Sequence, residues 1–134
     1  MASKVEVDEL AGAGSAGVMT VVAEGGSTTT SLQQGLAKQW AFYNQQTPAV
    51  GDSFNTGSIT DSSTGVYIVN FTNNMSSTNY SSNANSLDIG AYYLNVCVRA
   101  TFSTSAYRVD NMRQDFSTMQ DPDDSSNSAH GDLA

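Results

Sequence analysis

The clearest pattern of apolar and polar positions lies in Val66–Thr72, where large apolar side chains occupy every second position. The side chains that would share one face of a strand are Tyr67, Val69 and Phe71. A period of two is typical of a half-buried β-strand. The preceding run Asp61–Gly65 is rich in turn-forming residues, and Gly65 can adopt the positive φ of a chain reversal. The pattern therefore predicts a β-hairpin in which Ser58–Thr60 pairs with Val66–Thr72.

A longer alternation predicts a strand over Tyr92–Phe102, followed after the short turn Ser103-Thr104 by another strand over Ser105–Val109. The expected face of the longer strand carries Tyr92, Leu94, Val96, Val98, Ala100 and Phe102. The region between the hairpin and this strand, Asn73–Asn85, is expected to be a loop because it has no apolar period.

Leu36–Tyr43 is also predicted to be a strand, which Pro48 and Gly51 would end. The side chains expected on one of its faces are Leu36, Lys38, Trp40 and Phe42. A helical start across Ser31–Lys38 is an alternative for its first part, because the alternation there is imperfect.

The two ends of the chain differ from this centre. Residues 1–34 contain two short strand candidates, Val5–Val7 and Val18–Val22, separated by the Gly/Ala run Leu10–Gly17. Little in this segment can build a core, so we expect an arm that folds against a partner chain. The segment Asp121–Ala134 has almost no core-forming side chains and is expected to be an acidic tail that is mobile alone and is ordered only against a neighbour.

Composition fits a single domain that is displayed at a surface. The 134 residues are 39% hydrophobic and only 13% charged, against about 25% charged in ordinary soluble proteins. Serine, threonine and asparagine make up the difference. We expect an all-β fold: an antiparallel β sandwich or a β-rich trimeric fibre-type module over residues 35–120, with an extended N-terminal arm and the 121–134 tail.

The charge of the chain argues against several partners. The formal net charge is −8, and the basic residues are scattered: Lys4, Lys38, Arg99, Arg108 and Arg113. They cannot form the basic stripe that binds nucleic acid, and an anionic membrane surface is disfavoured for the same reason. No apolar run is long enough to span a bilayer. The N-terminus lacks the layout of a secretory signal. A protein made in the cytosol and carried outside on a particle would combine these properties.

Two motifs invite a chemical interpretation. Gly12–Gly17 matches the G-x-G-x-x-G pattern, but dinucleotide binding needs those glycines between a strand and a helix. The flanking residues predict no helix, so we interpret the run as a flexible loop or a close contact at a subunit interface. Cys97 is the only cysteine, which excludes an intrachain disulfide, and its apolar neighbours suggest a buried side chain.

Acidic residues and the single histidine do not form a recognisable site. Asp121–Asp124 lacks the loop layout of a calcium site, and His130 has no second histidine or cysteine pair nearby. Candidate glycosidase carboxylates are scattered: Asp52, Asp61, Asp88, Asp110 and Asp115. We therefore predict no enzyme activity, no catalytic, cofactor or metal site, and no specified ligand-binding residues. Tyr92, Tyr93 and Tyr107 could stack on sugars, although strand tyrosines are more often core or interface residues.

Residues 35–110 resemble a β domain of tail-fibre and other tail-associated proteins of marine bacteriophages. The matching positions are Gly35 to Lys38, Asp52 to Asn55, Ser58 to Asp61, Gly65, Tyr67, Val69 to Thr72, Asn79-Tyr80, and Ser105, Tyr107 and Val109. The segments around Trp40 and Phe42–Asn44 are only loosely in register with the aromatic pair of that family, and the acidic C-terminal end does not match its apolar closing strand.

The resemblance implies a structural virion protein, usually a homotrimer, without transferable catalytic residues. We expect a tail fibre or tail-associated protein that acts in particle assembly or host attachment and contacts other virion proteins through its arm. Two alternatives remain: a head-surface decoration or head-fibre protein, and a carbohydrate-binding receptor module that recognises a host-surface glycan.

Overall fold

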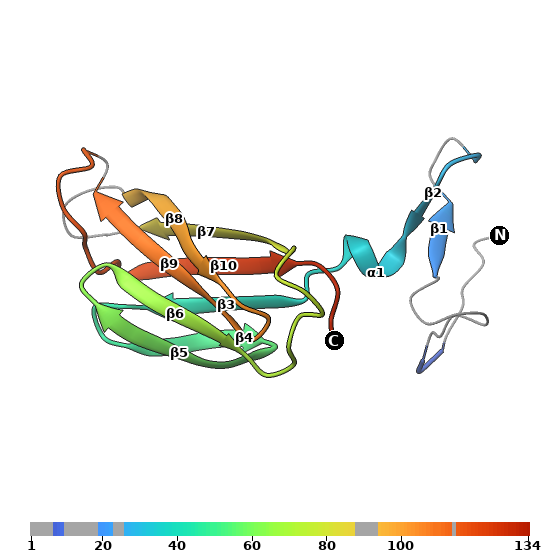
Figure 1. Cartoon of the computed structure of the whole chain (residues 1–134), viewed down its shortest axis with the longest axis horizontal. Helices are drawn as coiled ribbons and strands as arrows, with labels where there is room; N and C mark the ends of the chain where they lie inside the picture. The colour runs from blue at the N-terminus through green and yellow to red at the C-terminus, as the bar shows by residue number, and fades with distance from the viewer. Residues whose placement is uncertain (1–6, 10–18, 23–25, 88–93, 114) are drawn as a thin grey trace. The chain divides into compact units, whose positions relative to one another are not determined.

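The computed structural model describes residues 7–9, 19–22, 26–87, 94–113 and 115–134, with the side chains of residues 87 and 94–100 left out. It divides the chain into two compact units, Met1–Leu36 and Ala37–Ala134. Figure 1 shows the elements of both units. Among the described residues, no helix has the length and apolar character needed to cross a membrane.

The described part of the first unit is a small two-stranded sheet followed by one helical turn. Strand β1 (Thr20–Val22) pairs antiparallel with β2 (Thr29–Ser31), and α1 spans Leu32–Gly35. The Ser31 side chain caps this turn by accepting a hydrogen bond from the Gln34 N–H. The strand predicted over 18–22 thus corresponds to β1, and the alternative helical start to α1. The Gly12–Gly17 run and most of Val5–Val7 lie outside the described residues.

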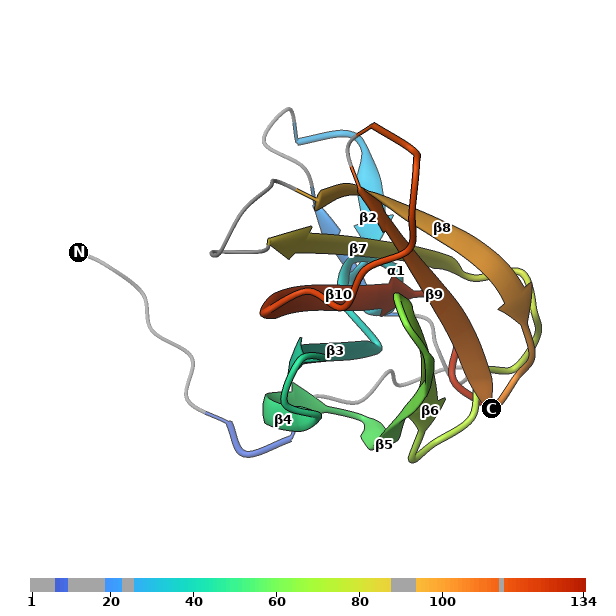
Figure 2. The ribbon, with the colours of Figure 1, turned by 90° about the vertical axis from the view of Figure 1, so that its left-hand side faces the viewer.

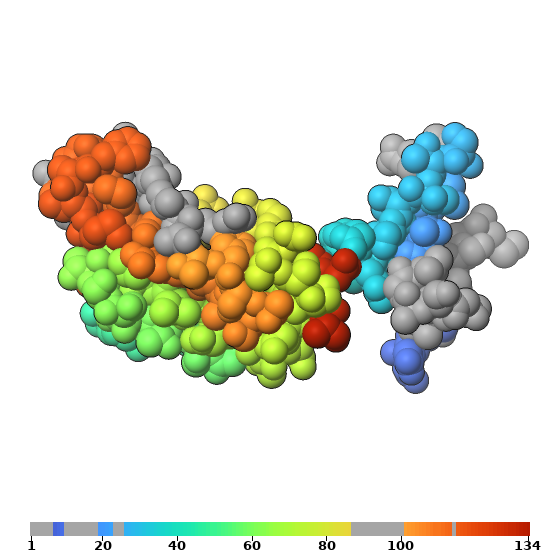
Figure 3. Space-filling view, viewed as in Figure 1, coloured from blue at the N-terminus to red at the C-terminus, as the bar shows by residue number. Residues whose placement is uncertain are grey.

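The second unit is an antiparallel β sandwich, which confirms the all-β prediction. One sheet has the order β4-β3-β10-β7 and the other β5-β6-β9-β8. The strands of the first sheet are β4 (Ala49–Phe54), β3 (Gln39–Asn44), β10 (Asp124–His130) and β7 (Ser81–Leu87). Those of the second are β5 (Thr56–Ser63), β6 (Val66–Phe71), β9 (Ala106–Arg113) and β8 (Leu94–Phe102). Figure 2 shows the two sheets as facing layers, and Figure 3 shows the side on which the second sheet and the connection after β6 form the surface.

The predicted hairpin is present as β5 and β6. Ile59 lies opposite Val69 and Thr60 opposite Ile68, as the alternation requires. Gly65 has φ +71° at the reversal, and a Cβ there would come within 2.6 Å of the Asn111 carbonyl oxygen. The strands predicted over 92–102 and 105–109 also pair with each other, as β8 and β9.

The C-terminal segment is not a mobile tail, and this prediction was wrong. Strand β10 lies in the middle of its sheet, where it pairs with β3 on one side and β7 on the other. Its inward residues Ser125, Asn127 and Ala129 are buried. They are small or amide side chains that fit beneath tyrosines of the opposite sheet, so the strand needs no large apolar residues of its own.

The loop prediction for Asn73–Asn85 was wrong in its last part, because β7 begins at Ser81. This strand has the sequence Ser-Ser-Asn-Ala-Asn-Ser-Leu, which carries no apolar period. It is held by seven consecutive register partners on β10, from Ser81 opposite His130 to Leu87 opposite Asp124. Backbone pairing rather than side-chain burial therefore defines this edge strand. Strand β4, in the region where Pro48 and Gly51 suggested an end, was also missed.

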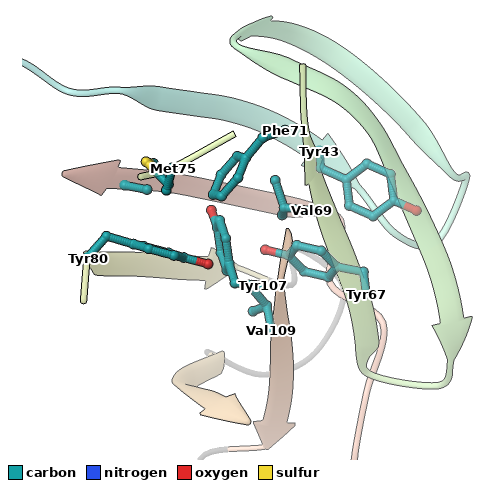
Figure 4. Packing of buried hydrophobic residues seen from close by; sticks show 9 residues of the cluster. Tyr43, Tyr67, Val69, Phe71, Met75, Tyr80, Tyr107 and Val109 are labelled. Atoms are coloured by element: carbon teal, nitrogen blue, oxygen red, sulfur yellow. The ribbon is translucent and has the colours of Figure 1, made fainter. Parts of the chain in front are cut away.

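The core between the sheets is built largely from tyrosines (Figure 4). The buried cluster comprises Tyr43, Tyr67, Val69, Phe71, Met75, Tyr80, Tyr107, Val109 and Ala129. Ring pairs lie close together, with centroids 5.2 Å apart for Tyr43 and Tyr67 and 4.6 Å for Tyr80 and Phe102. These residues are buried within one chain. This core is therefore complete without residues from a second copy.

The chain enters and leaves the sandwich at the same end. The Lys38 N–H, just before β3, donates to the Ala129 carbonyl oxygen near the end of β10 at 2.8 Å. The segment after β10 continues there, since Leu133 forms a β-bridge with Met75. The turns after β3 and between β5 and β6 lie at the other end of their strands.

Candidate functional site

The most distinctive surface of the sandwich is the outer face of the β4-β3-β10-β7 sheet. Alternate residues of β3 point in opposite directions: Gln39, Ala41 and Tyr43 are buried against the other sheet, while Trp40 and Phe42 are 40% and 42% exposed. The sequence predicted that Trp40 and Phe42 share a face, and this face is the outer one. Lys38, predicted on the same face, is buried just before the strand, and Leu36 belongs to the first unit.

The register of the four strands arranges the outward side chains in two rows. One row runs Phe54, Trp40, Ser128 and Asn83, and the neighbouring row runs Asp52, Phe42, Ser126 and Asn85. Direct cross-strand partners lie on the same face of a sheet. We call these eight residues the outer aromatic face.

The aromatic half of this face lies on β3 and β4. Phe54 is 50% exposed and pairs with Trp40 across the two strands. Gly51 gives the Phe42 ring its position, because a Cβ at this glycine would lie only 2.8 Å from Cδ1 of Phe42. The ring therefore rests over the backbone of β4, where any larger residue would displace it.

The polar half lies on β10 and β7. Its side chains surround a shallow hollow of about 180 Å³, lined by Asn83, Asn85, Ser126, Asn127 and Ser128. Within the described part of the chain, no hydrogen bond engages the side chains of Asn83, Asn85, Ser126 or Ser128. Amide and hydroxyl groups that can both donate and accept are thus presented beside three aromatic rings.

A second hollow, of about 280 Å³, lies over the other sheet and is lined by Ser62, Ile68, Thr101, Ser103, Ala106, Tyr107 and Arg108. Its charged group is already engaged, because Arg108 forms a bidentate ion pair with Asp110. This hollow has no exposed aromatic ring among its described side chains. It is therefore a weaker candidate than the outer aromatic face.

Three of the carboxylates considered for catalysis have separate local partners among the described residues. Asp61 accepts a hydrogen bond from Gln45, and Asp110 pairs with Arg108. Hydrogen bonds from Ser117 lower the pKa of Asp115. Asp88 lies outside the described residues.

Asp121, in the acidic run Asp121–Asp124, and His130 both have structural roles in the sandwich. Asp121 accepts the Gly65 N–H and so fixes the β5–β6 turn. His130 ends β10 opposite Ser81. Among the residues that the structure describes, no three histidine, cysteine, aspartate or glutamate side chains are grouped as metal ligands.

Tyr107 is not available for sugar stacking. Its side chain is buried, and its hydroxyl donates to Gln39 and Asn127. Burial is the main cause that raises its pKa far above the usual value for tyrosine, with further contributions from Tyr67 and Tyr80. Tyr107 therefore remains a protonated structural donor at neutral pH. Tyr92 and Tyr93 lie outside the described residues, as does the side chain of Cys97.

Sequence reasoning did not identify the outer aromatic face. One signal was available, because Trp40 is the only tryptophan of the chain and alternates with Tyr43, Ala41 and Gln39. The pattern alone does not say which of two mixed faces is buried. The polar half could not be found, since it depends on the pairing of β7 and β10.

Comparison with known proteins found no matching family model, no matching curated protein and no matching solved structure. The resemblance to bacteriophage tail proteins therefore stays a prediction.

Proposed function

We propose that this chain is a non-enzymatic structural protein of a tailed bacteriophage virion, a tail fibre or tail-associated component that displays a β sandwich. In this role, residues 1–36 attach the protein to the particle and to other copies, and residues 37–134 form the displayed module. The resemblance over residues 35–110 suggests the virion, and the division of the chain into two units supports an attachment part and a displayed part.

The observation that carries this proposal is the contrast between the two units. The sandwich buries a core of its own, whereas the described part of the first unit exposes apolar side chains: Val21 is 44% and Val22 64% exposed. A two-stranded sheet is marginal in water without packing partners. Contacts of this unit with another chain would remove these valines from water and stabilise the sheet.

The path of the chain through the sandwich also suits display. Entry at Lys38 and exit at Ala129 are joined by a hydrogen bond, so both connections leave one end of the module. An attachment at that end leaves the opposite turns and both outer sheet faces accessible.

A homotrimer is proposed through the arm rather than through the core. Light scattering on the full chain should give the mass of three copies. Replacing Val21 and Val22 by aspartate should shift the mass to that of one copy, because charge would be placed in the contact. Val50→Asp is the matched control, since Val50 is 43% exposed on the sandwich. The proposal would be contradicted if the full chain is monomeric. It would also be contradicted if the trimer dissociates in the Val50→Asp variant but not in the Val21 and Val22 variant.

The proposed location of the protein on the tail can be tested with purified virus particles. Labelled antibody against the sandwich should bind purified particles of the virus that encodes the chain, at the tail. Labelling of the capsid would instead support a head-surface decoration or head-fibre protein. Absence of the protein from purified particles would overturn the virion role.

A further inference from the structure

We propose that the outer aromatic face binds a neutral oligosaccharide, with a pyranose ring stacked on Trp40 and Phe54 and its neighbouring sugar hydrogen-bonded over the hollow of β10 and β7. This inference rests on the proposed display function, for which it names the ligand class. It uses the eight residues defined above and no residue of the first unit.

The aromatic half provides an apolar platform of the kind that a sugar ring fits. A pyranose has one or both faces lined with C–H groups, which pack on an aromatic ring while the hydroxyl groups point outward along the edge of the sugar. Trp40 and Phe54 lie on adjacent strands, about 5 Å apart in the direction of strand pairing. Phe42 extends the platform along β3, where Gly51 allows its ring to lie over the neighbouring strand.

The polar half provides partners for hydroxyl groups. From β3 to β7 is two strand spacings, about 10 Å, which a disaccharide laid across the strands would span. Along that line the register places Ser128 and then Asn83 beyond Trp40, with Ser126 and Asn85 beside them. An asparagine side chain donates and accepts at once, as a pair of neighbouring sugar hydroxyls requires. The hollow lined by these residues would receive the second sugar.

The composition of the face favours a neutral sugar over other occupants. Asp52 is its one ionisable residue, and the chain has a net charge of −8, so an anionic glycan would be repelled. A second copy of the chain could cover the three aromatic rings, but it would also remove the amides and hydroxyls of the polar half from water, and serine and asparagine make up half of this face. Exposed aromatics beside unengaged amides suit a ligand that is apolar on one face and hydroxylated at its edge.

Trp40 makes the proposal directly measurable, since it is the only tryptophan in the chain. We would titrate the full-length protein with neutral oligosaccharides of two to four units, separately built from glucose, galactose, mannose and N-acetylglucosamine, and record tryptophan fluorescence. At least one series should give a saturable change in intensity or wavelength. Sialylated and sulfated oligosaccharides of the same length should give none.

Variants locate the binding. Asn83→Ala and Asn85→Ala together leave Trp40 in place and should weaken the fluorescence-detected affinity by about tenfold, which corresponds to the loss of one or two hydrogen bonds. Trp40→Ala should abolish binding measured by calorimetry. Phe116→Ala is the matched control, because Phe116 is an exposed aromatic (63%) outside this face and its removal should leave the affinity unchanged.

The possible outcomes separate this inference from the display function. The inference is wrong if no neutral series gives a saturable signal, if binding survives Trp40→Ala, or if the fluorescence instead changes with protein concentration alone, which would indicate that a second copy covers the face. None of these results bears on particle labelling. Conversely, absence of the protein from particles would leave a measured sugar affinity intact.

Discussion

The Tyr107 hydroxyl donates a hydrogen bond to Oε1 of Gln39 at 2.9 Å, across the space between the two sheets. It also lies 3.0 Å from Oδ1 of Asn127, which accepts from Nε2 of Gln39 at 2.8 Å. The three side chains come from β9, β3 and β10, so a closed polar triangle joins both layers inside an aromatic core. Nδ2 of Asn127 is buried without a partner among the described residues, but the three hydrogen bonds of the triangle still link the two sheets and favour one alignment.

Removing the Tyr107 hydroxyl from this triangle should destabilise the fold. Tyr107→Phe keeps the ring but takes the Tyr107 donor away from Oε1 of Gln39 in a buried position, while Oδ1 of Asn127 keeps the hydrogen bond from Nε2 of Gln39. We expect the free energy of unfolding to fall by about 2 kcal/mol, measured by urea denaturation.

Tyr43→Phe is the matched comparison. The Tyr43 hydroxyl is buried and has no hydrogen-bond partner within the described part of the chain. Its removal should therefore leave stability unchanged or raise it slightly. Equal losses in the two variants would show that the triangle contributes nothing specific.

Stability should decline at alkaline pH. Burial raises the pKa of both Tyr107 and Tyr43 above the ordinary tyrosine value of 10.0. Between that value and the folded pKa, the unfolded chain loses protons that the folded chain retains. Stability is thus fully present below pH 10 and is lost as the pH rises further, by about 1.4 kcal/mol per pH unit for Tyr107, with Tyr43 acting in the same direction.

The measurement is urea denaturation at a series of pH values from neutral to strongly alkaline, with tyrosinate absorbance recorded alongside. Above pH 10, the free energy of unfolding of Tyr107→Phe should fall less steeply with pH than that of the wild type, because the contribution of Tyr107 is missing. The assignment would be contradicted by an unchanged slope in this variant, or by a loss of tyrosinate signal near pH 10 in the folded state when Tyr107 is replaced.

Truncation before Asp124 should abolish the fold. It removes β10 and leaves β3 and β7 without their shared neighbour, with the buried edges of both strands unpaired. Circular dichroism and amide dispersion in NMR spectra should report an unfolded or aggregated chain.

Deleting residues 1–36 is the control for this truncation. It removes a longer segment but leaves all eight strands of the sandwich and its core. The remaining protein should melt cooperatively. A truncated chain without β10 that still melts cooperatively would mean that the segment is dispensable after all.

Substitution of Asn55 should lower the stability of the fold for two reasons that can be measured separately. It has φ +52° where the chain passes from one sheet to the other. Its side chain donates to the carbonyl oxygens of Lys38 and Asn73 and accepts from the Asn73 N–H at 2.7 Å. Asn55→Gly keeps the backbone conformation and loses the hydrogen bonds, so we expect a loss of about 1 kcal/mol.

Asn55→Ala loses the same hydrogen bonds and adds the cost of a left-handed backbone conformation, for a total of about 2 to 3 kcal/mol. Thermal and urea unfolding of both variants measure the difference. If alanine is tolerated as well as glycine, the backbone argument is wrong.

The sequence predicted the strands whose side chains fill the core. Tyr67, Val69 and Phe71 alternate with smaller or less buried residues, and the resulting hairpin has the expected register. The pattern works there because the buried face is made of large apolar groups.

It could not find β7 and β10, because their inward positions hold serine, alanine and asparagine. These residues are buried because tyrosines of the opposite sheet cover them. The Tyr67 hydroxyl is hydrogen-bonded to the Ser125 hydroxyl, and the Tyr107 hydroxyl is hydrogen-bonded to Asn127. Long side chains of one sheet thus supply both the volume and the polar partners for the other. The outer aromatic face could not be predicted for the same reason, since half of its residues belong to β7 and β10.

The central position of β10 also sets the order of events during synthesis. The ribosome makes β3 first and β10 last among the eight sandwich strands, yet these two are direct neighbours. The β4-β3-β10-β7 sheet therefore stays incomplete until β10 has been made, whereas all four strands of the other sheet precede β10 in the chain. Residues 1–36, by contrast, emerge before any of these strands, so the contacts with other chains that the proposed function assigns to them can precede the folding of the sandwich.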